Sequence, residues 1–242
     1  MSKTRLSRLS TGIAGVVMSA LLVSAAWGYE AIEVKNGGQI TGEVKLVGNA
    51  PTPAKLVVTK DTAVCAKTPK VNEALLVGPN KGIKNVVVSI ANMEKGKKMG
   101  KGGTLDQRGC IYTPHVVLSP ARTELTIINS DGILHNIHTF SAKNPSLNKA
   151  QPKFKKTMKE KFAQPEIIKL TCDAHSWMSG WLVVQEHPYY AVTDATGAFT
   201  LTDVPPGDYE LRFWHETLGE MAQKVSVKAN QTTKVPITVT KP

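Results

Sequence analysis

Short runs of Val, Ile, Leu and Thr recur along nearly the whole chain, and clusters of Gly, Pro, Asn and Lys separate them. β-Branched side chains suit a pleated, half-buried surface, so apolar runs of this length predict strands rather than helices. We expect strands at residues 39–46, 55–59, 85–90, 114–118, 124–129, 167–172, 181–185, 198–201, 209–214 and 224–227. Only residues 143–161 have a mixed helical or loop character. Ten or so short strands joined by turns predict an all-β fold of Greek-key sandwiches and exclude a βαβ fold.

The N-terminal residues have the parts of a secretory signal peptide. Three basic residues precede an apolar run at residues 12–26, and the small residues Ala26 and Gly28 occupy the −3 and −1 positions of a cleavage site. Because this run is short for a bilayer span, residues 1–28 are predicted to be a cleavable signal peptide; a permanent N-terminal anchor is the alternative. The mature chain is then exported to the periplasm, where disulfides are permitted. No segment of the mature chain is long and apolar enough to cross a membrane.

Three zones follow the predicted signal peptide. Residues 29–104 form an N-terminal β region that ends in a Gly- and Lys-rich stretch, and residues 105–187 carry most of the side chains suited to chemistry. In residues 188–242, an Asp-x-x-Gly turn and a Pro-Pro-Gly turn separate strands with alternating apolar residues. This last zone resembles the carboxypeptidase regulatory-like (transthyretin-like) domain.

That resemblance has a gap at its beginning. Such a domain normally opens with a Gly-x-Ile-x-Gly-x-Val strand, and the chain has this pattern far upstream, at residues 38–44. Our hypothesis is that residues 31–100 and 188–242 form one discontinuous sandwich, with 105–187 inserted into it. An insertion at a surface loop is thermodynamically tolerable.

Four residues of the middle zone have the chemistry of a metal site. His135 lies in the sequence Leu-His-Asn-Ile-His, whereas Cys172, His175 and Met178 share one short segment between two predicted strands. A thiolate, two imidazoles and a weak axial thioether form the trigonal copper site that proteins use for electron transfer. Methionine is not a usual zinc ligand, so the set favours copper over zinc. A zinc site, a chance Cys-x2-His pair and a core role for Met178 are the alternatives.

The same residues carry a resemblance to the cupredoxin family. Residues 105–187 resemble cupredoxins, and most of all the amicyanin-like cupredoxins of methylamine-utilisation systems, in Cys-x2-His-x2-Met, in His-Asn-Ile-His at 135–138 and in Tyr-Thr-Pro at 112–114. The resemblance implies one type 1 copper ion with the ligands His135, Cys172, His175 and Met178. It also implies that Asn136 ties the two ligand loops together, with its backbone N–H near the thiolate. The predicted fold class is thus a Greek-key cupredoxin sandwich plus a transthyretin-like β-sandwich.

One position departs from that family, and four histidines fall outside the ligand set. Ser176 stands where amicyanin-like loops have a proline. His138 is expected to be a packed histidine rather than a ligand. The others are expected to be structural: His115, His187 and His215.

The two remaining cysteines, Cys65 and Cys110, predict a disulfide. In an exported protein this is the simplest use of two otherwise idle cysteines. The bridge would close a loop of about 45 residues and contribute ~3–4 kcal/mol by loop entropy. A second metal site that uses Cys110 and His115 is the alternative.

The number of histidines and the absence of several sequence motifs exclude some classes of enzyme. The chain has six histidines, too few for the trinuclear centre of a multicopper oxidase, and Cys172 has no neighbouring cysteine for a binuclear copper site. Serine-hydrolase, zincin, Walker and dinucleotide motifs are absent from the sequence, so we expect no enzyme activity beyond redox exchange. Two functions stay open: a periplasmic carrier of single electrons, and a copper-binding accessory module for storage, delivery or partner anchoring.

The charge balance indicates an acidic partner. The net charge is +11, and removing the three basic residues of 1–28 leaves 27 − 19 = +8. Seven lysines crowd residues 143–161 against a single Glu160. An acidic redox partner or an anionic membrane surface fits this charge, and nucleic acid does not, because the chain is exported and has no recognition motif. A solvated loop is the alternative for the lysines.

Overall fold

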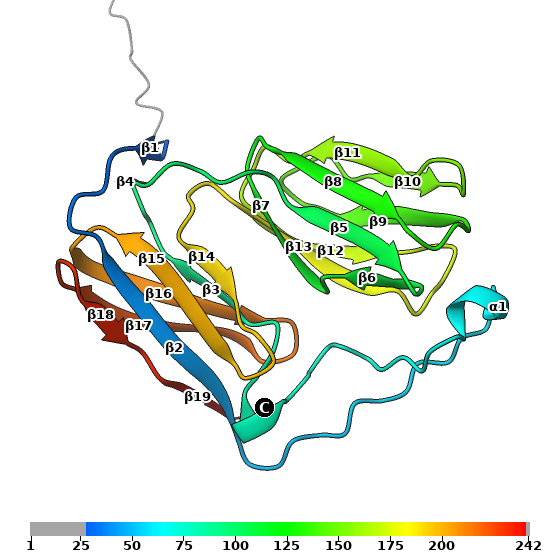
Figure 1. Cartoon of the computed structure of the whole chain (residues 1–242), viewed down its shortest axis with the longest axis horizontal. Coiled ribbons are helices and arrows are strands. Elements are labelled where there is room, and N and C mark those ends of the chain that lie inside the picture. Colours follow the sequence, from blue (N-terminus) through cyan, green and yellow to red (C-terminus); the bar gives the residue numbers. More distant parts are fainter. Residues whose placement is uncertain (1–27, 241–242) are drawn as a thin grey trace, which may run out of the picture.

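The computed structural model describes residues 28–240 and consists of two β-sandwiches that lie side by side (Figure 1). The prediction of an all-β fold with two sandwiches is confirmed. The predicted signal peptide, residues 1–28, lies outside the described residues except for Gly28. Across residues 28–240, no helix is long and apolar enough to span a membrane.

The first sandwich, called the cupredoxin-like sandwich here, comprises the strands β5 to β13. Their bounds are β5 Thr104–Arg108, β6 Ile111–Thr113, β7 Val116–Pro120, β8 Glu124–Asn129, β9 His135–Phe140, β10 Asn148–Gln151, β11 Thr157–Lys161, β12 Glu166–Thr171 and β13 Ser179–Gln185. One sheet has the order β10-β9-β12-β13-β7 and the other has β11-β8-β5-β6. The apolar core between the sheets includes Leu105, Ile127, Ile137 and Ile168, all fully buried.

The second sandwich, called the split sandwich here, combines strands from both ends of the described chain. Its main strands are β2 Gly38–Val47, β3 Val87–Ile90, β14 Tyr190–Val192, β15 Ala198–Val204, β16 Gly207–His215, β17 Gly219–Val227, β18 Thr232–Lys234 and β19 Ile237–Thr240. The sheets have the orders β14-β3-β16-β17 and β15-β2-β18, with β19 also paired to β2. Because β2 and β3 precede the cupredoxin-like sandwich in sequence and all their partners follow it, the chain leaves and re-enters this sandwich (Figure 1).

The connection from β2 to β3 makes a long excursion to the other sandwich. It carries the short helix α1 (Thr62–Cys65) and the 3-10 turn η1 (Pro79–Lys81), and α1 lies beside the cupredoxin-like sandwich (Figure 1). A small parallel pair, β1 (Glu30–Ala31) with β4 (Lys95–Gly96), completes the elements. The excursion places the start of α1 next to the predicted metal site, because Asp61 contacts His175 there.

The two sandwiches contact each other through an apolar cluster and through a buried histidine that lies against a carboxylate. The rings of Trp181 and Trp214 meet edge to face at 4.9 Å, over the buried valines Val87 and Val183. His115 Nε2 lies 2.5 Å from a carboxylate oxygen of Glu216 in the β16–β17 turn. Burial of apolar area supplies most of the attraction, and the buried His115 fixes the register of the contact.

Two predicted segments were wrong. Residues 55–59 form no strand; Lys55 makes one isolated bridge to Val71, and Val57 is 75% exposed. Val58 packs partly buried against the core of the cupredoxin-like sandwich, but the run has no continuous strand partner there. Residues 143–161, expected to be helix or loop, contain β10 and β11, each at the edge of its sheet. Lysines on edge strands discourage pairing with other chains, which explains why this strand sequence is so polar.

Candidate metal centre

The predicted ligands come from neighbouring strands and meet at one end of the cupredoxin-like sandwich. His135 is the first residue of β9, and Cys172 directly follows the end of β12. These strands are paired in an antiparallel register, so the start of β9 lies next to the end of β12. His175 and Met178 follow in the loop that leads into β13.

Three of the donor atoms face one another at metal-binding separations. Nδ1 of His135 lies 3.1 Å from Nδ1 of His175, and Sγ of Cys172 lies 3.8 Å from the same His175 nitrogen. All three donor atoms lie within 4.8 Å of one another, and their residues are 0–2% exposed. The arrangement leaves both Nδ1 atoms and the sulfur pointing to a common centre.

The loop between Cys172 and Met178 is closed by its own backbone. The N–H of Met178 donates to the carbonyl of His175 at 2.9 Å, and the N–H of Cys172 donates to the carbonyl of Met178 at 3.3 Å. Met178 is 1% exposed and belongs to the same apolar cluster as Cys172. The thioether is thus buried in the cluster that also contains Cys172.

Asn136 and Tyr112 hold the two ligand segments together. The N–H of Asn136 points at Cys172 Sγ at 3.5 Å, and its side-chain oxygen accepts from the backbone N–H of Asp173 at 2.5 Å. The fully buried Tyr112 hydroxyl contacts the carbonyls of Asn136 at 2.7 Å and Thr171 at 2.8 Å. Both sets of contacts fix the distance between β9 and the segment that follows β12.

Buried amides fix the loop that precedes His135. Gln107 donates to the side-chain oxygen of Gln151 at 2.5 Å, and Gln151 donates to the carbonyl of Ile127 at 3.2 Å. Asn129 donates to the carbonyls of Ile133 at 2.8 Å and Gln151 at 3.0 Å. Since Gln151 is paired with His135 in the sheet, this network positions the first ligand.

Two carboxylates contact the far nitrogens of the ligand imidazoles, and sequence reasoning missed both. Asp131 Oδ2 lies 2.9 Å from His135 Nε2, and Asp61 Oδ2 lies 2.9 Å from His175 Nε2. Asp131 is four residues before His135, so its spacing was a usable signal. Asp61 is separated from His175 by 114 positions and lies at the start of α1, so nothing local could indicate it.

The surroundings favour a thiolate at Cys172. Burial acts to raise its pKa, but hydrogen bonds from His135 and from the N–H of Asn136 outweigh burial and hold the pKa below its ordinary value. For His135, burial lowers the pKa, whereas the bonds to Asp131 and Cys172 raise it to about 9. For His175, burial lowers the pKa and the bond to Asp61 does not restore it. A thiol with a lowered pKa binds metal ions more readily.

The disulfide between Cys65 and Cys110 is confirmed, with a Cα–Cα distance of 5.3 Å. It joins α1 to the turn between β5 and β6. Cys110 therefore has no free thiolate, which rules out the alternative metal site with His115. For the same reason, the second cluster of possible ligands, formed by Cys110, Asp131 and His135, lacks a sulfur donor.

The remaining histidines contact carboxylates and backbone. His138 Nδ1 lies 3.0 Å from Asp173, and its ring stacks on Phe140 at 4.5 Å. His187 and His215 each accept a backbone N–H two residues ahead at 3.2 Å and are buried. His115 makes the contact to Glu216 described above. None of these four rings lies in the cluster of His135, Cys172 and His175.

The donor set fits copper. Two imidazole nitrogens, one thiolate and an adjoining buried thioether are the ligands of blue-copper sites, whereas structural zinc sites use Cys, His and carboxylate donors. The two nearby carboxylates are directed to the imidazole Nε2 atoms, so they orient the rings. The residues present therefore suit a single copper ion.

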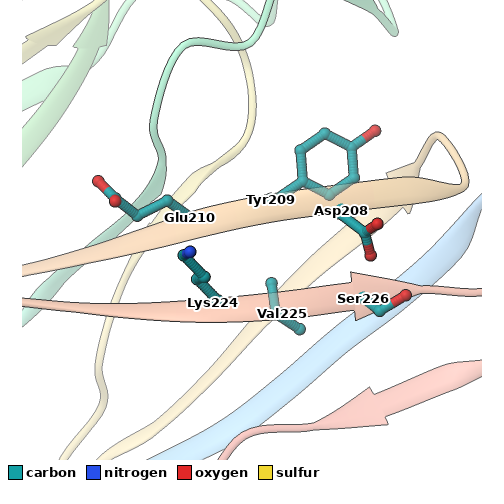
Figure 2. A pocket seen from close by; sticks show the side chains of 6 residues that line it. All are labelled: Asp208, Tyr209, Glu210, Lys224, Val225 and Ser226. Atoms are coloured by element: carbon teal, nitrogen blue, oxygen red, sulfur yellow. The ribbon is translucent and has the colours of Figure 1, made fainter.

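A surface hollow elsewhere on the molecule has no such chemistry. Figure 2 shows it on β16 and β17 of the split sandwich. Its lining comes from three cross-strand pairs, Asp208 with Ser226, Tyr209 with Val225 and Glu210 with Lys224. These six residues include no histidine, cysteine or methionine, and none of the predicted site residues.

The C-terminal resemblance has independent support. A family profile of the carboxypeptidase regulatory-like domain matches residues 182–240. The match begins within β13 and ends with β19, so it covers the C-terminal strands of the split sandwich and not β2 or β3. Among curated proteins, none matches this chain.

Solved structures similar to this chain include cupredoxins. A purple cupredoxin from Nitrosopumilus maritimus has 19% identity and a TM-score of 0.29, over 34% of this chain and 98% of that one. A mutant of amicyanin in the Cu(I) form has 17% identity and a TM-score of 0.32, over 40% and 98%. A copper-containing nitrite reductase from Thermus scotoductus has 20% identity and a TM-score of 0.31, over 38% of this chain but 24% of its own.

Proposed function

We propose that this protein is an exported, periplasmic blue-copper protein that transfers single electrons between redox partners, without catalysing a further reaction. One copper ion would be held by His135, Cys172 and His175, with Met178 as the weak axial ligand. The observation that carries the proposal is the convergence of two Nδ1 atoms and one thiol sulfur within 4.8 Å in a buried cluster. We further propose that the ligand loop is of the amicyanin type.

The protein's part in electron transfer is to keep the ligands in place. When bound, copper supplies a one-electron couple between Cu(I) and Cu(II). The Asn136 and Tyr112 contacts hold β9 and the Cys172 segment at fixed spacing, and the closed loop holds Met178. A site that changes little between oxidation states reorganises little, which favours rapid transfer. The buried apolar surroundings also exclude water from the donors.

The experiment that tests this function is electrochemical. We expect a reversible one-electron couple and fast electron self-exchange in the copper-loaded mature chain. The alternative, a copper storage or delivery module in which the split sandwich anchors a partner, predicts ready loss of Cu(I) to a competing chelator. Rapid Cu(I) release with slow self-exchange would contradict the carrier and favour the accessory module.

We propose an acidic protein as the redox partner. The loop at 152–156 joins β10 to β11, and its three lysines, Lys153, Lys155 and Lys156, are exposed together with Phe154, which is 85% exposed. Gln151 is paired with His135, and the carbonyl of Lys156 accepts the N–H of Asn129 at 2.9 Å. The loop therefore extends past the end of the sandwich that carries the ligands. Positive charges there can steer an acidic partner over about a Debye length, ~8–10 Å at physiological salt.

Replacing these three lysines with glutamine tests the partner proposal. The probe is oxidation of the reduced protein by hexacyanoferrate(III), an anionic oxidant, at several ionic strengths. The triple variant should react more slowly at low salt and show a flatter salt dependence, with an unchanged absorption spectrum. A matched control replaces Lys224, Lys228 and Lys234, three exposed lysines of the split sandwich. If the oxidation rate had the same salt dependence in the two triple variants, the lysines at 153–156 would have no role in docking and would only form a solvated loop.

A further inference from the structure

The most distinctive feature of the site is a cap that comes from outside the cupredoxin-like sandwich. His175 is 0% exposed, although it lies on a surface loop between β12 and β13. Its Nε2, the nitrogen turned away from the other donors, lies 2.9 Å from Asp61 Oδ2. Asp61 belongs to the long excursion between β2 and β3, which reaches across from the split sandwich (Figure 1).

The position of Asp61 is fixed by several contacts. The N–H groups of Val64 and Cys65 both donate to the Asp61 carbonyl at 2.9 Å, which closes the first turn of α1. Cys65 is joined to Cys110 by the disulfide, and the buried Lys70 ammonium donates to the Cys65 carbonyl. The carboxylate that meets His175 is thus attached to a crosslinked turn and not to a freely moving loop.

The same disulfide is connected to the carboxylate of the other imidazole. Asp131 accepts the backbone N–H groups of Gly109 at 2.6 Å and Cys110 at 2.7 Å, and it contacts His135 Nε2. In addition, the Trp177 indole N–H donates to the Cys110 carbonyl at 3.0 Å, and its ring packs 5.1 Å from that of His175. Both carboxylates and the ligand loop therefore converge on Cys110.

We propose that Asp61 is a positioning residue, held by the Cys65–Cys110 crosslink, that orients His175 through Nε2 and closes its solvent edge. The inference builds on the proposed copper site. A carboxylate on the far nitrogen of a metal-binding imidazole fixes its tautomer and raises its basicity. A more basic imidazole and a nearby negative charge stabilise Cu(II) relative to Cu(I), so Asp61 lowers the reduction potential. Because the edge of His175 is covered, redox partners make no direct contact with this ring.

The first measurement needs no metal. Diethyl pyrocarbonate modifies accessible imidazole nitrogens. In the metal-free protein, peptide mass spectrometry measures the modification of His175 separately from that of the other histidines. We expect His175 to be protected in the wild type and to react roughly tenfold faster or more in Asp61→Ala, the factor that one hydrogen bond to a charged group can supply. Asp61→Asn keeps an acceptor oxygen and should preserve the protection. Equal His175 reactivity in the wild type and Asp61→Ala would overturn the cap.

The second measurement is the reduction potential of the copper-loaded variants. Both Asp61→Ala and Asp61→Asn should raise it, because both remove the carboxylate charge. Asp173→Asn is the matched control: it removes a charge next to Cys172, but Asp173 contacts His138 and not a ligand imidazole. It should leave His175 protected and shift the potential less than either Asp61 variant. A potential that does not change in the Asp61 variants would refute the positioning role. Failure of the wild type to bind copper would refute the proposed function. The diethyl pyrocarbonate measurement would still test the Asp61 cap, because it is made on the metal-free protein.

Discussion

The two sandwiches have a similar architecture but bury different side chains. The apolar core of the split sandwich includes Ile40, Val88 and Phe213. Its buried polar side chains, such as Thr193 and His187, make hydrogen bonds to the backbone. The core of the cupredoxin-like sandwich includes Cys172 and Met178, and buried polar side chains such as Gln107 lie next to it. The difference indicates that one sandwich is built for packing, whereas the other accepts the free-energy cost of buried polar groups to hold a reactive site.

The largest effect that separates the two sandwiches is expected from Phe213→Ala. Phe213 is 1% exposed in β16 and meets Phe199 edge to face at 5.9 Å. The lost area and the cavity should lower the free energy of unfolding by about 3–5 kcal/mol, measured by urea denaturation. Copper binding and colour should stay, since no donor comes from this sandwich.

The matched core variant in the other sandwich is Leu170→Ala. Leu170 is 1% exposed in β12, two residues before Cys172. It should lower stability by about 2–5 kcal/mol and also disturb the absorption of bound copper. Loss of colour in Phe213→Ala with retention in Leu170→Ala would contradict the division of roles.

A smaller effect is expected at the end of the cupredoxin-like sandwich remote from the ligands. Glu166, at the start of β12, accepts from the Ser141 hydroxyl and the Ala142 N–H at 2.5 Å each and from the Asn144 amide at 2.9 Å. Burial raises its pKa, but these bonds dominate and lower it from 4.5 to about 2. The lowered pKa means that Glu166 stabilises the folded state above pH 4.5 and that this contribution disappears as the pH falls toward 2.

Glu166→Gln should therefore lose about 1–2 kcal/mol at neutral pH, after allowance for solvent screening, and almost nothing near pH 2. Urea unfolding of the metal-free protein at pH 7 and pH 2 measures the difference. The control, Glu210→Gln, removes an exposed carboxylate of the split sandwich that contacts Arg212. If both variants showed the same pH dependence, the bonds at 141–144 would contribute no pH-linked stability.

The smallest effect concerns the axial position. Met178→Leu should retain coloured copper and raise the reduction potential, because the three strong ligands remain and the drier site favours Cu(I). The expected rise is on the order of 60 mV, which corresponds to one tenfold change for a single electron. Voltammetry of the two proteins measures it. A lowered potential, or loss of metal binding, would exclude Met178 as the axial ligand.

Local sequence was enough for many of the central strands and for the disulfide, and it predicted three residues whose donor atoms the structure brings together, His135, Cys172 and His175. Val- and Ile-rich runs became strands at β3, β8, β12 and β13 because their branched side chains fill a half-buried face. The pairing of Cys65 with Cys110 followed from redox compartment and count, since Cys172 had a separate role. The relative positions of the predicted ligands depend on the pairing of β9 with β12 and on the short loop that follows β12.

Long-range contacts were beyond the reach of sequence patterns. The contact of Asp61 with His175 depends on where the excursion between β2 and β3 crosses the other sandwich, and no periodicity encodes that path. The strands β10 and β11 were missed because edge strands carry lysines that resemble those of a loop. Residues 55–59 have strand composition, but the structure offers them no partner sheet, so composition alone was misleading.

The most direct test is the visible absorption spectrum of residues 29–242 after addition of Cu(II), compared with Cys172→Ser. A thiolate bound to Cu(II) in a trigonal site predicts an intense band near ~600 nm in the wild type. The band should be absent in Cys172→Ser, while far-ultraviolet circular dichroism shows an unchanged fold. A colourless Cu(II) complex of the wild type, or the same band in both proteins, would contradict the assignment of Cys172 as a copper ligand.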